Sequence, residues 1–357
     1  MTSSKESSKQ VRVAIAGLGG HGGTIQNACD KAANLNVVAV FDTDEELATQ
    51  AANRFDCYQA LSYEEMIRRE DIDAVVLVTP NYLHKKQVMG ALENDLHVFV
   101  EKPIALTLDE GMAMVSKAEM KGQVLMVGHN MRYWPTARKA KNWLQEGHLG
   151  QVISVEIHFS SPSGMRLPLD SWRRKPELCP ILPITQLAIH GFDLVHYLIG
   201  FIDEVTTYTR SALTNDEVID SSSAIFRLDN GVLGSMISNY CSRELFELRI
   251  SGTKGTVRLR PDSFWFKELS LAGEDDKLAI EELDKTKGFE SYDLIMESFG
   301  KAVLEYSLPE TDGWVGLQAL AVVDAMQRSA GASATPWKVE RFQSASLSNT
   351  IEPASLV

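Results

Sequence analysis

The 357-residue sequence predicts two folded domains: a doubly wound parallel α/β domain, followed by an α+β domain with a large, mostly antiparallel open sheet. Short apolar segments alternate with helix-like segments through the first third, which is typical of a parallel sheet covered on both faces. Beyond about residue 150, strand-like segments follow one another directly and alternate apolar with polar residues. The length itself suits two domains of ordinary size.

The first domain is expected to span residues 11–131 and to contain five apolar strands. These strands are predicted at Val11–Ala16, Asn36–Phe41, Asp73–Val78, His97–Val100 and Val124–Val127. Helices are predicted from the glycine-rich turn to about Ala33, at Glu45–Arg54, at Tyr82–Glu93 and from about Asp109. Strands that alternate with helices of this length indicate parallel pairing through helical crossovers.

The second domain is expected to span residues 132–340. An amphipathic helix that ends in glycine is predicted at Pro183–Gly200. Strands are predicted at Val152–Phe159, Val205–Ser211, Ser222–Leu228, Val232–Asn239, Leu245–Ser251, Gly255–Leu259 and Phe264–Leu269, with a hairpin turn at Asp229-Asn230-Gly231. Helices at Ser291–Tyr306 and Gly313–Ser329 should flank this sheet or pack back on the first domain, and residues 1–10 and 341–357 should be weakly ordered tails.

Composition excludes several classes of protein. The formal net charge of −13 argues against nucleic acid as a partner, because phosphate binding needs a basic surface. No apolar run is long enough to cross a bilayer, and the N-terminal residues lack the apolar core of a secretory signal. The four cysteines are far apart, which predicts neither disulfides nor a metal site. We therefore expect a cytoplasmic protein without a metal, whose ligand is a small molecule and not a membrane or nucleic acid.

A glycine motif lies between the first strand and the first helix. Gly17-Leu18-Gly19-Gly20-His21-Gly22 matches G-x-G-x-x-G, and this position is the structural context that the motif requires. Gly17 would permit the tight turn, Gly19 would let the backbone approach a pyrophosphate, and Gly22 would let helix and strand pack closely. Gly20 and His21 complete the loop, and the helix N-terminus offers free N–H groups to an anion. The sequence thus predicts a dinucleotide site, with a ligand-free glycine turn as the alternative.

Asp42 ends the second strand and predicts which dinucleotide binds. A carboxylate at this place can accept hydrogen bonds from both hydroxyls of the adenosine ribose and would repel a 2′-phosphate. No arginine follows within several residues to receive such a phosphate. NAD is therefore favoured over NADP, with a solvated loop aspartate as the alternative.

Several further motifs occur in a fixed order along the chain. They are Thr79-Pro80-Asn81-Tyr82-Leu83-His84, Glu101-Lys102-Pro103, Gly128-His129-Asn130-Met131-Arg132, Trp172-Arg173, His190-x-x-Asp193 and Ile250-Ser251-Gly252-Thr253-Lys254-Gly255. With the glycine loop, they make residues 11 to about 330 resemble the glucose-fructose oxidoreductase, inositol dehydrogenase and MocA family. The resemblance implies a Rossmann domain and an α+β domain whose exposed sheet face forms dimers and tetramers in relatives. We therefore expect a homodimer or homotetramer.

The resemblance also implies roles for individual residues. On the cofactor side it places Thr79, Pro80, Asn81, His84, Glu101 and Lys102, with Glu101 near the nicotinamide ribose. At the border of the substrate and cofactor cleft it places Arg132, Trp172 and Arg173. Lys102 would reach the reacting oxygen and His190 would be the acid/base. These residue types suit alcohol oxidation, since a histidine can take the hydroxyl proton near neutral pH and an ammonium group stabilises the developing alkoxide.

The helix that carries His190 departs from the family pattern. Gln186 occupies the position of the family's usual aspartate, one helical turn before His190. Glutamine can hydrogen-bond the substrate or the imidazole, but it cannot stabilise an imidazolium by charge. Asp193 lies three residues beyond His190 and could supply a carboxylate, or it could be a cap or a hydrogen-bond partner in the core.

Together these features predict an NAD-dependent oxidoreductase. It would transfer a hydride between nicotinamide and a secondary alcohol or ketone of a sugar, a sugar derivative or a cyclitol. Two alternatives stay open: a lyase or glycosidase that retains NAD and oxidises its substrate transiently, and a non-enzymatic NAD-binding regulator similar to the galactose-pathway repressor. The presence of both Lys102 and His190 favours an enzyme.

Overall fold

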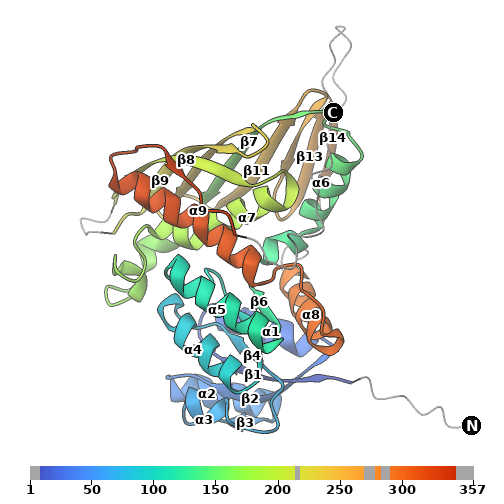
Figure 1. Cartoon of the computed structure of the whole chain (residues 1–357), viewed down its shortest axis with the longest axis vertical. Coiled ribbons are helices and arrows are strands. Elements are labelled where there is room, and N and C mark those ends of the chain that lie inside the picture. Colours follow the sequence, from blue (N-terminus) through green and yellow to red (C-terminus); the bar gives the residue numbers. More distant parts are fainter. Residues whose placement is uncertain (1–8, 214–217, 269–277, 283–289, 343–357) are drawn as a thin grey trace, which may run out of the picture.

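The computed structural model describes residues 9–213, 218–268, 278–282 and 290–342. Two β-sheets occupy opposite halves of the molecule, and long helices run between them (Figure 1). One sheet is entirely parallel and the other is mixed but mostly antiparallel, which confirms the predicted fold class. Most of both predicted tails lies outside the described residues.

The parallel sheet has six strands in the order β3-β2-β1-β4-β5-β6. The strands are β1 (Val11–Ala16), β2 (Leu35–Phe41), β3 (Tyr58–Gln59), β4 (Ala74–Leu77), β5 (His97–Val100) and β6 (Leu125–Val127). The order reverses between β1 and β4, and ligands of doubly wound sheets bind at the carboxyl ends of the strands beside such a reversal. β3 was not predicted, because it has only two residues and no apolar run.

Five helices accompany this sheet. They are α1 (His21–Lys31), α2 (Glu45–Phe55), α3 (Tyr63–Met66), α4 (Asn81–Glu93) and α5 (Leu108–Lys121). Side-chain caps fix the start of three of them: Asp44 accepts from the backbone of α2, Ser62 from the backbone of α3 and Thr107 from the backbone of α5. α5 ends at Gly122 in the left-handed region. The predicted helices are confirmed, and the short α3 was not expected.

Among the described residues, the second sheet has nine strands in the order β14-β13-β12-β11-β7-β10-β9-β8-β15. The strands are β7 (Val152–Ser160), β8 (Ile202–Arg210), β9 (Ser221–Leu228), β10 (Leu233–Asn239), β11 (Leu245–Gly252), β12 (Gly255–Leu259), β13 (Ser263–Glu268), β14 (Leu278–Glu282) and β15 (Trp337–Lys338). Only the central pair of β7 and β10 is parallel among the described pairs. Burial alternates strictly along β9, so one face of the sheet packs inward and the other is exposed. The unpredicted helix α6 (Pro135–Gln145) precedes this sheet.

The predicted amphipathic helix at 183–200 differs from the structure in two ways. Its first part, Ile184–Ala188, is a π-helical turn, and it continues as α7 (Ile189–Leu198). It is also not amphipathic, since residues 181–195 are all buried. The reason is that this helix lies in contact with the second sheet on one side and with α6 and α9 on the others.

Two late helices join the two halves of the molecule. α8 (Glu290–Glu305) packs on α1 of the first domain, and its Phe299 ring meets Phe99 of β5 at 5.8 Å between centroids. α9 (Gly313–Gly331) contacts α5 and β6 on one side and β8 and α7 on the other (Figure 1). The domain boundary predicted at residue 132 stays a prediction. α8 lies far beyond this boundary in the chain but completes the core of the first domain.

Candidate active site

The glycine loop has the geometry that its sequence predicts. Gly17 has a φ of +90°, and a Cβ added there would lie 2.5 Å from the carbonyl oxygen of Val78. A Cβ on Gly22 would lie 2.4 Å from the carbonyl oxygen of Gly17, so only glycine lets α1 approach β1 this closely. α1 begins without a side-chain cap and without an acid in its first turn. Its N-terminus therefore suits the pyrophosphate of a dinucleotide.

Asp42 lies beside this loop. Its carboxylate accepts hydrogen bonds from the backbone N–H of Leu18 at 2.6 Å and of Asp44 at 2.9 Å. These bonds fix the carboxylate at the carboxyl edge of the parallel sheet, next to the residues that would hold a pyrophosphate. The structure thus brings the predicted ribose acceptor and the glycine loop together.

A cavity of about 220 Å³ lies between the carboxyl edge of the first sheet and the second domain. Nine of the predicted site residues line it: His21, Thr79, Asn81, Glu101, Lys102, Trp172, Arg173, Gln186 and His190. They come from α1, from the ends of β4 and β5, from a 3₁₀ turn at Trp172–Arg174 and from the helix of His190. Residues far apart in the sequence therefore converge on one small polar cavity.

Lys102 reaches across this cavity from the first domain to the second. Its Nζ donates a hydrogen bond to the backbone carbonyl of Gln186 at 3.1 Å, within the π-helical turn. The Lys102–Pro103 peptide bond is cis. Burial lowers the pKa of Lys102, and the neighbouring Arg173 lowers it further, against an opposing effect of Glu101. A π-helical turn of this kind is frequent at functional sites, because it reorients backbone groups.

Glu101 supplies a buried negative charge beside Lys102. Its carboxylate accepts from the backbone N–H of Lys102 at 3.2 Å and lies 3.3 Å from Nε2 of His21. A Cβ on Gly128 would lie 2.6 Å from this carboxylate, so glycine is required there to make room for it. Burial alone would raise the pKa of Glu101, but His21 and Lys102 outweigh it and hold the pKa below its usual value.

His190 enters the cavity from α7. Its side chain is buried, and Nδ1 has no hydrogen-bond partner among the described residues. Burial holds the pKa of His190 well below its usual value, and Lys102, His129 and His21 act in the same direction. The imidazole is therefore neutral near pH 7 and can accept a proton. The Gln186 amide does not bond to His190, since its Nε2 points to Sγ of Cys179 at 3.9 Å.

Besides Asp42 and the glycines of the loop, three predicted site residues do not line the cavity. Arg132 is committed to Asp193, with three N–O contacts of 2.6 to 3.0 Å, and does not line the cavity. Both ring nitrogens of His84 lie against backbone carbonyls, Pro103 O at 2.9 Å and Thr79 O at 3.0 Å. His84 thus ties together two cavity-lining loops. Pro80 caps the start of α4 and does not line the cavity either.

Other residues that line the cavity were not assigned from the sequence. They are Val78, Asn130, Met131, Leu187, Tyr240, Phe246 and Tyr292. Asn130 and Met131 lie within a motif that was identified, and that motif could have indicated them. Tyr240, Phe246 and Tyr292 come from the second sheet and from α8, where nothing in the local sequence distinguishes them from core aromatic residues. The pKa of Tyr292 is raised by burial.

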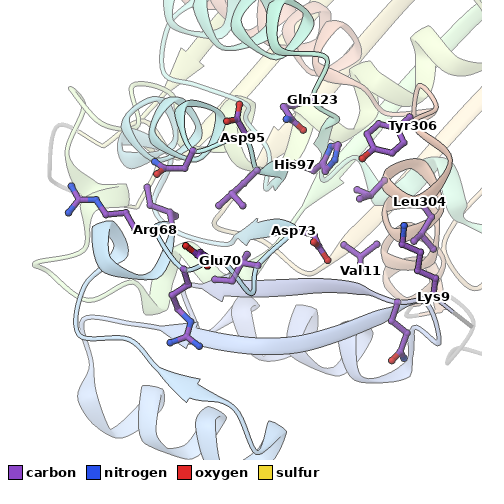
Figure 2. Close-up of a pocket in the computed structure, with 17 residues that line it drawn as sticks. Lys9, Val11, Arg68, Glu70, Asp73, Asp95, His97, Gln123, Leu304 and Tyr306 are labelled. Carbon is purple, nitrogen blue, oxygen red and sulfur yellow. The ribbon is translucent and has the colours of Figure 1, made fainter. Parts of the chain in front are cut away.

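A larger cavity of about 440 Å³ lies at the opposite edge of the parallel sheet. Figure 2 shows that Asp73 and His97, which lie at the amino-terminal starts of β4 and β5, face it together with Val11 and Tyr306. None of the predicted site residues lines it. Because ligands of doubly wound sheets bind at the carboxyl edge, the smaller cavity is the candidate active site.

Comparisons with known families agree with the fold and identify the family. Residues 11–129 match a model described as "Oxidoreductase family, NAD-binding Rossmann fold". Residues 137–258 match a model described as "GFO/IDH/MocA C-terminal domain". The two models follow one another along the chain, and together they cover the parallel sheet and strands β7 to β11 of the second sheet.

Curated relatives are similar over different shares of the chain. A 2,7-anhydro-N-acetylneuraminate hydratase of Mediterraneibacter gnavus is 32% identical over 56% of this chain and 52% of its own length. The match thus spans about half of that relative. A D-xylose 1-dehydrogenase (NADP(+)) of Haloferax volcanii is 28% identical over 84% of this chain and 91% of its own. An inositol 2-dehydrogenase of Rhizobium meliloti is 27% identical over 89% of this chain and 96% of its own length.

Solved structures agree with the fold. The structure of levoglucosan dehydrogenase in complex with NADH superposes with a TM-score of 0.85 at 23% identity, over 94% of this chain and all of that one. In the part of the chain that the structure describes, no helix is both long and apolar enough to span a membrane.

The ion pair of Arg132 and Asp193 should contribute strongly to stability. Burial alone would raise the pKa of Asp193, but Arg132 outweighs it and holds the pKa below its usual value. Arg132→Met should therefore lower the free energy of unfolding by about 3–5 kcal/mol at pH 8, because it leaves a buried carboxylate without a partner. The loss should shrink at pH 5, since the unpaired Asp193 has a raised pKa and takes up a proton in the folded variant. Urea unfolding at both pH values measures this.

Arg132→Met/Asp193→Leu is the matched control, because it removes both charges. It should recover most of the stability lost in the single variant. A single variant as stable as the wild type at both pH values would contradict the assigned role of the pair.

Proposed function

Because the chain belongs to the oxidoreductase family with an NAD-binding Rossmann fold and a GFO/IDH/MocA C-terminal domain, we propose that it is an NAD-dependent dehydrogenase. Its substrate would be a secondary alcohol, or the corresponding ketone, of a sugar, a sugar derivative or a cyclitol. The observation that carries this proposal is the convergence of Lys102 and His190, from different domains, on one cavity at the carboxyl edge of the sheet.

Different residues of the cavity would carry out different parts of the reaction. Bound NAD would accept or deliver the hydride. The neutral imidazole of His190 accepts the hydroxyl proton of the substrate as the carbon is oxidised, and returns it in the reverse direction. The ammonium of Lys102 lies next to the same space and stabilises the negative charge that develops on the substrate oxygen. Glu101 favours the charged form of Lys102, because its carboxylate opposes the lowering of the Lys102 pKa by burial.

The substrate class follows from the polarity of the cavity and from the relatives. Xylose and inositol dehydrogenases are among the relatives that match most of this chain. Trp172 and Arg173 stack on each other at one side of the cavity, with the guanidinium 4.6 Å from the ring centroid. A sugar can pack against such a ring and hydrogen-bond to the charged group beside it.

An NAD-retaining lyase is the second candidate. Hydratases of Mediterraneibacter gnavus and Escherichia coli match this chain at 32% and 28% identity, each over about half of its own length. Such an enzyme would turn over without added cofactor, whereas a dehydrogenase would consume or produce NADH in proportion to product. Absorbance of NADH during reaction with levoglucosan, myo-inositol and D-xylose distinguishes the two.

The exposed face of the second sheet supports assembly into a homodimer or homotetramer. Four large apolar side chains lie on this face: Tyr208, Ile225, Leu233 and Ile237, between 48% and 68% exposed. They belong to the adjacent strands β8, β9 and β10 and form one surface. An apolar patch of this kind marks an interaction site. A second copy of the chain would cover it, in a cytoplasm that keeps the four free cysteines reduced.

Cofactor choice should depend on Asp42. Isothermal titration calorimetry should show tighter binding of NADH than of NADPH, because the carboxylate repels a 2′-phosphate. Asp42→Ser should reduce this preference. Asp44→Ser is the matched control: it removes the same charge two residues away but keeps a side chain that can cap α2. Equal affinities for the two cofactors in the wild type would overturn the proposal.

Catalysis should depend on Lys102 and His190 more than cofactor binding does. Lys102→Met and His190→Asn should each lower kcat by about 10²–10⁴-fold, the usual range for acid–base help, while the Kd of NADH stays near the wild-type value. Lys86→Ala and His148→Ala, on the surface, are the controls. Full activity of Lys102→Met would remove the catalytic assignment and favour a non-enzymatic regulator.

Assembly should depend on the apolar face of the second sheet. Light scattering at micromolar concentration should give a dimer or tetramer for the wild type. Ile225→Glu/Ile237→Glu should give a smaller species, because it places charges in the interface. Leu61→Glu, which changes a residue that is 88% exposed in the first domain, should not alter the mass. A monomeric wild type would show the proposal to be wrong.

A further inference from the structure

His129 is a buried histidine that the proposed reaction does not use. It follows β6, its side chain is fully buried, and neither ring nitrogen has a hydrogen-bond partner among the described residues. By contrast, the other buried histidines away from the cavity are paired, His84 with two carbonyls and His97 with Val124 N–H, and the half-buried His196 is paired with Ile202 N–H. Leaving a buried polar group unpaired is costly, so such a group calls for a functional explanation.

The His129 ring, with its unpaired nitrogens, has two neighbours in the proposed site: the His190 imidazole and the Asp193 carboxylate. Its ring is 6.4 Å from the ring of His190 between centroids, at an angle of 86°. Its Nδ1 lies 3.9 Å from Oδ2 of Asp193. Nδ1 of His190 is buried and unpaired as well. The two imidazoles with unpaired buried nitrogens are thus neighbours, and Asp193 lies beyond them, held in place by Arg132.

We propose that His129 is a positioning residue for His190, which links the His190 imidazole to the Asp193 carboxylate and thereby fixes which ring nitrogen of His190 faces the substrate. The inference rests on the proposed dehydrogenase function. It concerns a second histidine and a carboxylate that act behind the proton acceptor.

In this arrangement each histidine donates a hydrogen bond to the next group, from His190 to His129 and from His129 to Asp193. His129 donates its Nδ1–H toward Asp193, which leaves its Nε2 lone pair to accept the Nδ1–H of His190. Nε2 of His190 then carries a lone pair that faces the cavity and takes the hydroxyl proton of the substrate. Asp193 does not itself take up a proton, because Arg132 holds its pKa low. This is how a carboxylate behind a histidine sets its tautomer in other enzymes.

The proposed link requires small movements of these side chains. The 3.9 Å between His129 Nδ1 and Asp193 Oδ2 exceeds a hydrogen bond by about 1 Å. Hydrogen bonds of catalytic groups are often long in ligand-free structures and shorten when the substrate is bound.

Gln186 explains why this chain needs such a link. The glutamine replaces the acid expected one turn before His190. Its side-chain amide donates toward Cys179, and its backbone carbonyl accepts from Lys102. No carboxylate among the described residues hydrogen-bonds to His190, so Asp193 reaches it only through His129.

Burial keeps both imidazoles neutral, and the charged groups around the two rings act in both directions. Asp193, Arg132, Lys102 and Glu101 face His129, and Lys102, His129 and His21 face His190. Burial is the largest effect on both rings and lowers the pKa of each. A neutral histidine has two tautomers, and only one of them presents a proton acceptor to the substrate. His129 selects that one.

The tautomer of His190 can be measured without a substrate. Long-range ¹H–¹⁵N correlation spectra of the NAD-loaded full chain with ¹⁵N-labelled histidine should show His190 protonated at Nδ1, with peaks assigned by their loss in His190→Asn. In His129→Phe a substantial fraction should move to the Nε2-protonated form. His196→Gln, which removes the half-buried histidine of α7, should leave the His190 peaks unchanged. The inference is overturned if His190 is protonated at Nε2 in the wild type, or if the tautomer of His190 is the same in His129→Phe as in the wild type.

Kinetics provide the second readout, with NAD and levoglucosan, myo-inositol and D-xylose as the probes. His129→Phe should lower kcat by roughly 10²-fold, at the lower end of the contribution of general-base catalysis, with little change in KM. The acid limb of the pH profile should shift, because the imidazolium of His190 loses its acceptor. If His129→Phe does not fold, His129→Gln replaces it in both experiments. Equal losses in His129→Phe and His196→Gln, without a shift of the pH profile, also overturn the inference.

The two experiments separate this inference from the proposed function. A correct tautomer without turnover of any probe contradicts the dehydrogenase and leaves the role of His129 intact. Turnover with an unperturbed tautomer in His129→Phe contradicts only the role of His129.

Discussion

The buried ion pair of Arg132 and Asp193 is the contact on which the geometry of the site depends. Arg132 follows the last strand of the parallel sheet, and Asp193 lies on α7 of the second domain. The guanidinium also donates to the carbonyl of Glu310 at 3.1 Å, just before α9. Removing two charges from water is costly, so such a pair persists only with complete geometry. It therefore fixes α7, three residues from His190, against the end of the first sheet.

Around this anchor, burial sets the protonation states of the chemical groups. Lys102 and His190 are both taken out of water, which lowers the pKa of each. Glu101 opposes this effect at Lys102, and no carboxylate does so at His190 among the described residues. One cavity thus places Lys102, with a carboxylate that favours its charged form, beside a neutral imidazole. Oxidation of an alcohol requires this combination, since one group must accept a proton while the other stabilises negative charge.

Most of the first domain could be predicted because its signals are local. Five of the six parallel strands and the glycine loop follow from short apolar runs and from the steric needs of Gly17 and Gly22. β3 was missed, since its two residues carry no pattern and pair only because β2 is already in place. In the second domain the hairpin strands were predicted from alternation. The π-helical turn at Ile184–Ala188 was not, because its apolar residues fit an ordinary helix equally well.

The sequence by itself determined the fold class, the dinucleotide loop and the candidate chemical groups, because each depends on residues close together in the chain. Only the tertiary structure decided how those groups are used. It pairs Arg132 with Asp193 rather than placing the arginine in the cavity. It also directs the backbone carbonyl of Gln186 toward Lys102 and brings Tyr292 from α8 into the site. These contacts join residues between 61 and about 190 positions apart, and no local pattern specifies them. They are set by the packing of two domains and by the cost of leaving charges unpaired where water is excluded.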